Sequence, residues 1–187
     1  MTGLILLAAG QSARMGQPKQ LLPFQGRPLI RHACEVALAS TCQPVVVVIG
    51  ERAAQMRTAL AGLPVEICEN VNWAQGIGSS IHAGVQIADT GNWDALVLAL
   101  ADQPMIRPEI YDELVKRQAP VVASQYAGTV GVPALFTRCM FPALLALDPN
   151  QGCKSVILAN RQTAVLVDCP EAEVDVDTPE DYQRLRS

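Results

Sequence analysis

The alternation of apolar and polar positions along the chain predicts short buried strands separated by helices. Several short runs consist mainly of Val, Leu, Ile and Ala, which is typical of strands covered on both faces. These runs lie at residues 4–7, 45–49, 65–68, 94–101 and 121–124. Apolar residues at helical spacing follow them, at residues 28–40, 52–61, 79–88 and 108–118. Strands that alternate with helices predict an α/β fold with a mostly parallel central sheet.

The last third of the chain is less regular. Residues 126–136 predict an irregular ribbon, in which Pro133 marks the edge of a sheet. Short helices are expected at residues 141–147 and 153–159, and a strand at residues 173–177 leads into a final helix. No internal repeat or low-complexity linker divides the 187 residues, so we expect a single domain.

Composition narrows the class of protein. Half of the residues are hydrophobic but only 4% are aromatic, so the core is expected to consist of small aliphatic side chains. The net charge of −4, without basic runs, argues against a nucleic-acid surface. The six cysteines show no Cys-x-x-Cys spacing, which favours reduced intracellular thiols over a disulfide framework or a zinc site. No apolar run approaches the ~20 residues of a membrane span, so we expect a soluble, cytoplasmic protein.

The loop at residues 8–19 is the clearest candidate for chemistry. It follows the first buried strand, consists largely of small and polar residues, and carries Arg14 and Lys19. A loop at the carboxyl end of a buried strand is where open α/β sheets bind ligands, and its N–H groups and cations suit phosphate. The spacing from Gly10 to Gly16 and Lys19 does not fit the ATPase phosphate loop. The dinucleotide fingerprint fails too, because the segment at residues 76–81 lacks its third glycine.

Carboxylates are expected at the same edge of the sheet. Asp102 ends the strand at residues 94–101, and Pro104 prevents that strand from continuing. Alternation in the segment at residues 173–177 places Asp175 and Asp177 on one face. Two carboxylates suit Mg²⁺, which binds oxygen ligands and usually takes one or two from the protein. Helix capping is the alternative role for Asp102 and Asp177, and also for Ser79 and Ser80 at the start of a helix.

The segment LAAGQSARMGQPKQLLPFQGRPLI resembles the signature of the MobA-like nucleotidyltransferases that load molybdopterin with a nucleotide. Within that family it is most similar to the CTP:molybdopterin cytidylyltransferases. The resemblance implies one three-layer α/β/α Rossmann-like domain over residues 1–187. Residues 1–105 would bind the nucleotide, and residues 106–187 would form the molybdopterin side.

The resemblance also assigns roles to single residues. Asp102 would bind magnesium, with manganese as the alternative ion, and Asp177 would be the second metal ligand, with Asp175 in reserve. Lys19, Arg14 and Asp102 would be catalytic. The nucleotide-binding residues would be Leu7, Ala8, Ala9, Gly10, Arg14, Gly16, Lys19, Gly76, Gly78, Ser79, Ser80 and Asp102, with positions 76–80 beside the nucleobase.

The molybdopterin side is where the chain departs from the family pattern. Asn150, Cys153 and Lys154 stand where many relatives have Asp, Ala and Arg. Lysine keeps the positive charge of arginine but loses its bidentate grip on phosphate. The substrate-binding residues implied by the resemblance are Gln103, Gly131, Pro133, Gly152 and Lys154.

The activity implied is transfer of CMP from CTP to the terminal phosphate of molybdopterin or the molybdenum cofactor, with release of pyrophosphate. A phosphate monoester with a second pKa of about 6 is already ionised at neutral pH, so no general base is required. Three alternatives remain open: guanylyl transfer to the same cofactor, nucleotidyl transfer to a sugar or polyol phosphate, and a cofactor-holding chaperone. The expected partners are CTP, the cofactor and a molybdenum-containing oxidoreductase client.

Overall fold

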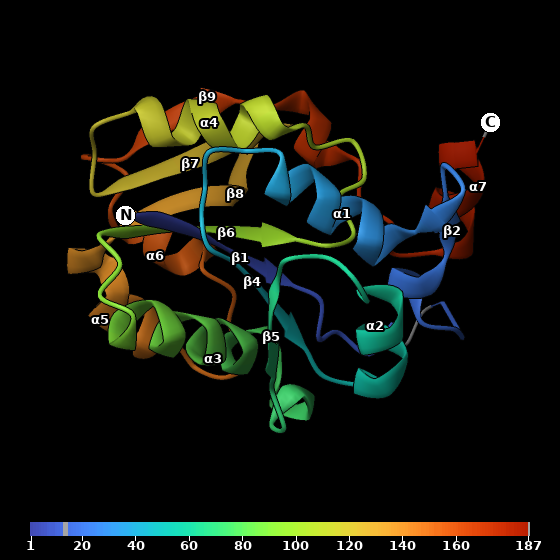
Figure 1. Cartoon of the computed structure of the whole chain (residues 1–187). Helices are drawn as coiled ribbons and strands as arrows, with labels where there is room; N and C mark the ends of the chain where they lie inside the picture. The colour runs from blue at the N-terminus through green and yellow to red at the C-terminus, as the bar shows by residue number, and fades with distance from the viewer. Residues whose placement is uncertain (13–14, 187) are drawn as a thin grey trace.

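A seven-stranded sheet runs through the middle of the computed structural model, which describes residues 1–12 and 15–186 (Figure 1). The strand order is β5-β4-β1-β6-β8-β7-β9. Strand β8 runs antiparallel to both of its neighbours, whereas the other pairs in this sheet are parallel. The strands are β1 Thr2–Leu7, β4 Val45–Ile49, β5 Glu66–Glu69, β6 Ala95–Leu100, β7 Val121–Tyr126, β8 Thr129–Thr137 and β9 Val165–Asp168.

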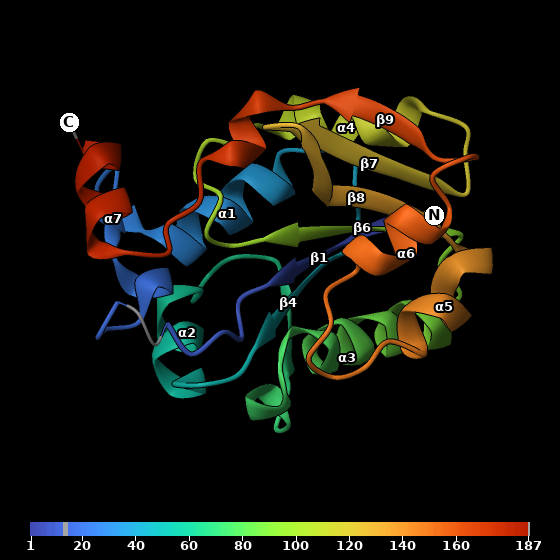
Figure 2. The ribbon, with the colours of Figure 1, turned by 180° about the vertical axis from the view of Figure 1, so that it is seen from behind.

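Helices cover both faces of this sheet, as Figures 1 and 2 show from opposite sides. One face packs against α1 Leu29–Leu38, α2 Ala53–Ala59 and α4 Pro108–Lys116. The other packs against α3 Ile77–Thr90, α5 Phe141–Leu145 and α6 Lys154–Ala159. Short 3-10 helices are η1 Lys19–Leu21, η2 Trp73–Gln75, η3 Arg138–Met140 and η4 Pro170–Glu173. The predicted α/β/α architecture is confirmed. Across the described residues, no helix combines the length and apolar character that crossing a membrane requires.

The apolar runs of the sequence form strands because both of their faces are buried. In β1, Leu4 and Leu6 point into the core on the α1 side, and Ile5 and Leu7 into the core on the α3 side. Burial of apolar surface stabilises this arrangement on both faces, by about 25 cal/mol for each Å² removed from water. The first strand is thereby fixed at the centre of the sheet, and the loop that follows it leaves from the carboxyl edge.

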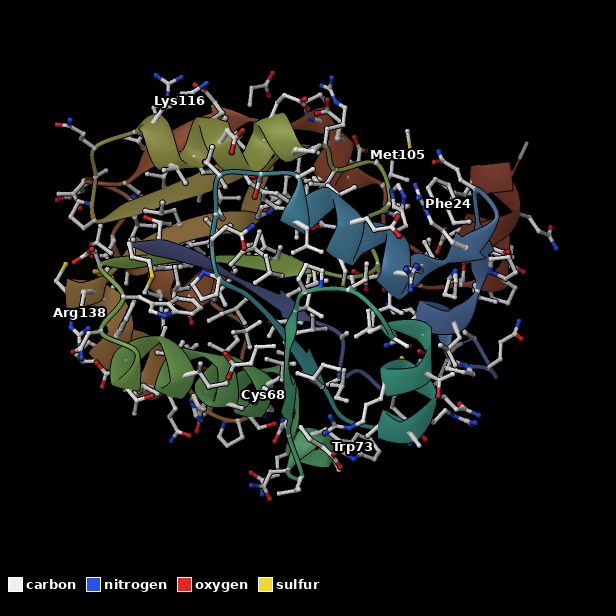
Figure 3. The ribbon with its side chains drawn as sticks, in the orientation of Figure 1. Phe24, Cys68, Trp73, Met105, Lys116 and Arg138 are labelled. Atoms are coloured by element: carbon white, nitrogen blue, oxygen red, sulfur yellow. The ribbon has the colours of Figure 1, made fainter. Side chains whose placement is uncertain are left out.

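A third, smaller hydrophobic cluster lies outside the two main layers. The strands β2 Pro23–Phe24 and β3 Arg27–Pro28 form a hairpin, and helix α7 Pro179–Arg186 packs beside it (Figure 2). Phe24 points into the space between the hairpin and α7, where it is labelled in Figure 3. The Tyr182 hydroxyl donates a hydrogen bond to the carbonyl of Pro23 at 2.6 Å. The members of this cluster are Met15, Leu22, Phe24, Leu29, Val176, Tyr182 and Leu185.

The strand predicted at residues 173–177 is wrong. The last strand of the sheet is β9 Val165–Asp168, which the sequence reading overlooked, and the 3-10 helix η4 follows it. The segment after η4 is extended but is not paired as a strand. Its N–H at Val176 bonds to the carbonyl of Asp102, which lies beyond the end of β6. Its alternation is nevertheless as expected: Val176 is buried, and Asp175 and Asp177 both face the cavity described below.

The prediction that Pro133 marks a sheet edge is also wrong. Residues 126–136 contain the end of β7, a tight turn at Ala127 and Gly128, and most of β8, which lies inside the sheet. Pro133 is tolerated there because the β7–β8 register shifts at Ala123 and Ser124, and the β6–β8 pairing ends at Ala134. The missing N–H of Pro133 therefore interrupts no ladder bond.

The packing predicts which cysteines react. Burial raises the pKa of Cys34 to about 12, that of Cys42 to about 11 and that of Cys153 to about 12, so these thiols are inert at neutral pH. Cys139 is exposed. In the folded protein an aromatic disulfide reagent should label Cys139 first, and all six thiols only after unfolding. Cys139→Ser should remove the fast phase, and rapid labelling of Cys153 would contradict the packing.

Candidate active site

A cavity of about 450 Å³ opens at the carboxyl edge of β1 and β6. Its walls come from four parts of the chain that are distant in sequence: the loop after β1 together with the start of η1, the segment from η2 into α3, the end of β6 with Asp102, and the segment after η4. The lining residues are Leu7, Ala8, Ala9, Gly10, Gln11, Lys19, Gln20, Trp73, Ala74, Gly76, Ile77, Ser80, Leu100, Ala101, Asp102, Asp175 and Asp177. The loop and the aspartates singled out in the sequence thus meet around one hollow.

Three charged side chains form the floor of this cavity. The Lys19 ammonium donates to Asp102 Oδ2 at 2.5 Å and to Asp177 Oδ1 at 2.6 Å. The exposed fractions of the Lys19, Asp102 and Asp177 side chains are 12%, 17% and 31%. Burial alone would lower the pKa of Lys19, but the two carboxylates outweigh it and raise the pKa above 10.5. Lys19 is therefore a fixed positive charge at this position.

The acidic side of the cavity has spare ligand capacity. Asp102 Oδ1 is buried without a hydrogen-bond partner among the described residues, although an unpaired buried carboxylate oxygen is costly. The pKa of Asp175 is raised, first because part of its side chain is withdrawn from water and then because Asp177 and Asp102 are near. A cation bound here would relieve both conditions.

The donor set fits a small oxygen-binding cation. Across residues 1–12 and 15–186, no cluster of three or more His, Cys, Asp or Glu side chains is arranged to hold a metal ion unaided. Asp102 and Asp177, with Asp175 beside them, offer carboxylate oxygens only. Mg²⁺ and Mn²⁺ accept such ligands, and Mg²⁺ commonly completes its shell with phosphate oxygens and water. The site therefore suits a cation that arrives together with a phosphate chain.

The loop after β1 is held in shape by Gln20, which the sequence reading did not single out. This side chain is 3% exposed. Its Nε2 donates to the carbonyls of Gly10 at 3.0 Å and Ala8 at 3.3 Å, while Ser12 Oγ donates to its Oε1. The N–H of Lys19 donates to Ser12 Oγ, which closes the loop on itself. The loop is thus preorganised, and its adjacency to Lys19 was the only sequence signal for Gln20.

Trp73 and Ser80 line the opposite wall, and Figure 3 shows Trp73 at the short helix η2 beyond the end of β5. Trp73 packs over Gly50, where a Cβ atom would lie 2.6 Å from the Trp73 Cβ. Asn70 Nδ2 donates to Ser80 Oγ at 3.0 Å and to Ser79 Oγ at 2.9 Å. Ser80 Oγ accepts this bond, and the hydrogen of its hydroxyl is not used in it. Trp73 and Asn70 were both missed in the sequence.

Two of the residues expected beside the nucleobase have a packing role instead. At Gly78 a Cβ atom would lie 2.2 Å from the carbonyl oxygen of Asp148, so this glycine allows the loop at residues 148–151 to contact α3. Ser79 Oγ donates within the turn, with the carbonyls of Gly76 at 2.7 Å and Asn72 at 3.0 Å as acceptors. Gly76 does line the cavity, and its φ of +121° requires glycine.

The remaining predicted site residues that the structure describes do not line this cavity. Gly16 is exposed beyond it, and Arg14 lies outside the described residues. Gln103 is buried behind Asp102. On the far side of β6, the Lys154 ammonium donates to Thr129 Oγ1 at 2.5 Å from an exposed position. The other residues predicted for molybdopterin belong to β8 or lie at or just before the start of α6, and they are Gly131, Pro133, Gly152 and Lys154.

The ion triad predicts a measurable loss of stability. Lys19→Met leaves two carboxylates facing each other, so we expect the free energy of unfolding to fall by about 3 kcal/mol, the low end for a broken buried pair, since Asp177 is partly exposed. Because the folded-state pKa of Lys19 is raised, its contribution is complete below pH 10.5 and is lost as the pH rises through the folded value. Urea unfolding of both proteins should therefore show a constant difference near neutral pH that narrows above pH 10.5. A difference that does not change with pH would refute the ionic origin.

Comparison with known proteins agrees with this site. A family model described as a MobA-like NTP transferase domain matches residues 4–165. The nicotine blue oxidoreductase of Paenarthrobacter nicotinovorans is 34% identical over 97% of this chain and 94% of its own length. The molybdenum cofactor cytidylyltransferase of Escherichia coli strain K12 is 27% identical over 95% and 92%. The molybdenum cofactor guanylyltransferase of Rhodobacter capsulatus is 30% identical over 96% and 92%.

A solved structure extends the likeness to three dimensions. The manganese complex of Rv0371c from Mycobacterium tuberculosis H37Rv matches with a TM-score of 0.79 at 26% identity, and the match covers 98% of this chain and 96% of that chain. That relative binds a divalent cation, and the family model spans most of the sequence, including the loop after β1 and Asp102. The chain therefore belongs to the MobA-like NTP transferase family of nucleotidyltransferases.

Proposed function

We propose that the chain transfers CMP from CTP to the terminal phosphate of molybdopterin or the molybdenum cofactor and releases pyrophosphate. The observation that carries this proposal is the placement of Lys19 between Asp102 and Asp177, beneath a loop whose backbone suits phosphate. Membership of the family does not choose the reaction, because its members include a named oxidoreductase and two named cofactor nucleotidyltransferases. The residues of the cavity support the choice.

We base the proposal of CTP on the residues of the wall opposite the carboxylates. The Ala9 methyl lies close to Gly50, where a Cβ atom would be 2.9 Å from it, and Trp73 packs against the same glycine. Ala9 itself lines the cavity, where its methyl leaves less room for a purine than a glycine would. Ser80, with a hydrogen to donate, could meet an acceptor on the edge of cytosine.

The residues act by positioning and electrostatics. Lys19 would leave its bridge between the carboxylates to contact the triphosphate, where it would oppose the charge that gathers on the departing pyrophosphate. Asp102 and Asp177 would hold a divalent ion, Mg²⁺ or Mn²⁺, which supplies charge neutralisation and aligns the phosphate chain. Arg14, which belongs to the same loop in the sequence, is proposed as the second cation on the phosphates.

The acceptor would enter from the side of β8 and α6. We assign Gly131, Pro133, Gly152 and Lys154 to this side, with Lys154 as the phosphate anchor. The terminal phosphate of molybdopterin is already ionised at neutral pH, so it can attack the α-phosphorus without a protein base. Its attack forms the new P–O bond as the bond to pyrophosphate breaks.

The decisive experiment is a pyrophosphate-release assay with four mixtures. The protein is incubated in Mg²⁺ with CTP and molybdopterin, with GTP and molybdopterin, with CTP and a sugar phosphate, or with molybdopterin alone followed by a binding measurement. Release only in the first mixture supports the proposal. Release with GTP or with the sugar phosphate supports the corresponding transferase instead. Binding of molybdopterin without release in any mixture supports a cofactor-holding protein.

Asp102→Asn tests the acidic floor with the smallest change of shape. The variant keeps the side-chain volume but removes the charge that would hold the metal, so we expect turnover to fall by about 10²–10³-fold. The measurement is the initial rate of pyrophosphate release over a range of Mg²⁺ concentrations. Asp168→Asn, an exposed carboxylate at the end of β9, is the matched control and should remain at wild-type rate. Unchanged turnover in Asp102→Asn would exclude the assigned role.

The choice of base is tested by ligand-induced stabilisation. CTP with Mg²⁺ should raise the melting temperature more than GTP with Mg²⁺ does at equal concentrations, since a ligand that binds the folded state stabilises it in proportion to its affinity. Ala9→Gly, which removes the methyl from the crowded wall, should narrow this difference. Equal shifts in the wild-type protein, or a larger shift with GTP, would reverse the assignment.

A further inference from the structure

The two acidic segments of the site come from parts of the chain with no regular structure to space them. Asp102 follows the end of β6, and Asp175 and Asp177 lie in the unpaired segment between η4 and α7. A metal site built from both requires their separation to be fixed, because carboxylate ligands must lie within a few tenths of an ångström of a set distance. Some contact between the segments must provide that constraint.

Gln103 makes this contact. Its Nε2 donates to the carbonyl of Ala172 at 2.9 Å and to the carbonyl of Val132 at 3.3 Å. One adjacent backbone bond, from the N–H of Val176 to the carbonyl of Asp102 at 3.0 Å, runs in the opposite direction. A single amide therefore joins the residue next to Asp102 to η4, which directly precedes the segment that carries Asp175, and to strand β8.

The surroundings of the Gln103 side chain require a hydrogen-bond donor. The Gln103 side chain is 5% exposed and does not line the cavity, so its amide is not available to a substrate as the sequence reading expected. Both of its described partners are carbonyl oxygens, which accept and never donate. Its Oε1 has no described partner, which leaves the donor half of the amide as the part that bonds. A side chain of the same length without N–H would leave both carbonyls unsatisfied.

We propose that Gln103 is a positioning residue, which sets the separation between Asp102 and the Asp175–Asp177 segment and thereby the affinity for a divalent cation. This inference rests on the metal site of the proposed function, but not on the identity of the nucleotide or of the acceptor. It assigns Gln103 no contact with substrate.

The test compares two substitutions that each remove a buried hydrogen bond to β8. Gln103→Met keeps the length of the side chain and removes its donors, whereas Ser124→Ala removes the 2.7 Å bond from Ser124 Oγ to the carbonyl of Pro133, next to Val132. Ser124 is fully buried, so both variants lose comparable stability. Of the two side chains, only Gln103 bonds to η4, the helix that leads into the segment with the second aspartate.

Binding of Mn²⁺ alone to each protein is measured by electron paramagnetic resonance, together with the melting temperature and the KM and kcat of pyrophosphate release. Gln103→Met should weaken Mn²⁺ binding by about 10-fold or more, as is usual for residues that orient metal ligands. Its metal requirement in turnover should rise by a similar factor, while the KM for CTP at saturating metal stays close to wild type. Ser124→Ala should lower the melting temperature and leave Mn²⁺ binding unchanged.

Each outcome decides the matter. Wild-type Mn²⁺ affinity in Gln103→Met, or equal weakening in both variants, would overturn the positioning role. If Gln103→Met does not fold, Gln103→Asn, which keeps the amide but shortens its reach, replaces it with the same criteria. A wild-type protein that binds Mn²⁺ but transfers no nucleotide would remove the proposed function, while weakened Mn²⁺ binding in Gln103→Met would still uphold the positioning role.

Discussion

The contact of one ammonium with two carboxylates is the interaction on which the site depends. Lys19 draws together the loop after β1, the end of β6 and the segment before α7, and its ammonium offsets negative charge in a partly buried place. A lysine is suited to this position because its small ammonium can contact both aspartates and then rotate to another anion. The same contact offsets part of the negative charge of the acidic floor.

The parallel sheet explains why these groups meet. Strands β1, β4 and β6 run in the same direction, so the loops that leave them emerge at one edge. Asp102 reaches this edge from the central strand next to β1. Asp177 arrives by a different route, because η4 and the extended segment return the chain past the end of β6. The cavity is therefore a product of topology, and its chemistry comes from a few side chains added at that edge.

Much of this arrangement could be predicted from the sequence, for identifiable reasons. The buried strands form continuous apolar runs, and the loop after β1 changes composition abruptly. The pairing of Asp175 and Asp177 was predicted although their segment is not a strand, because alternation requires only an extended backbone. The roles of the glycines and serines at residues 76–80 were harder to predict. Whether a small residue there faces a ligand or a neighbouring loop depends on where residues 148–151 pack.

The polar side chains that organise the site were not predictable. Gln20, Asn70 and Gln103 each bond to groups whose proximity is created only by the fold. The antiparallel direction of β8 could not be predicted from the sequence for a similar reason. An antiparallel strand buried in a mostly parallel sheet has the same apolar composition as its neighbours, and Pro133 appeared to exclude an interior position until the irregular register made room for it.

The small hydrophobic cluster between the hairpin and α7 gives the site a second mechanical support. Asp102 is held by the sheet, whereas the segments that carry Lys19 and Asp177 each lead into this cluster, through Leu22 and Val176. The two supports have separate cores, so they can loosen independently. Weakened packing around Phe24 and Tyr182 would let the segment that carries Asp177 move away from Asp102 while the sheet stays intact. The cavity would then widen although every strand of the sheet remains paired.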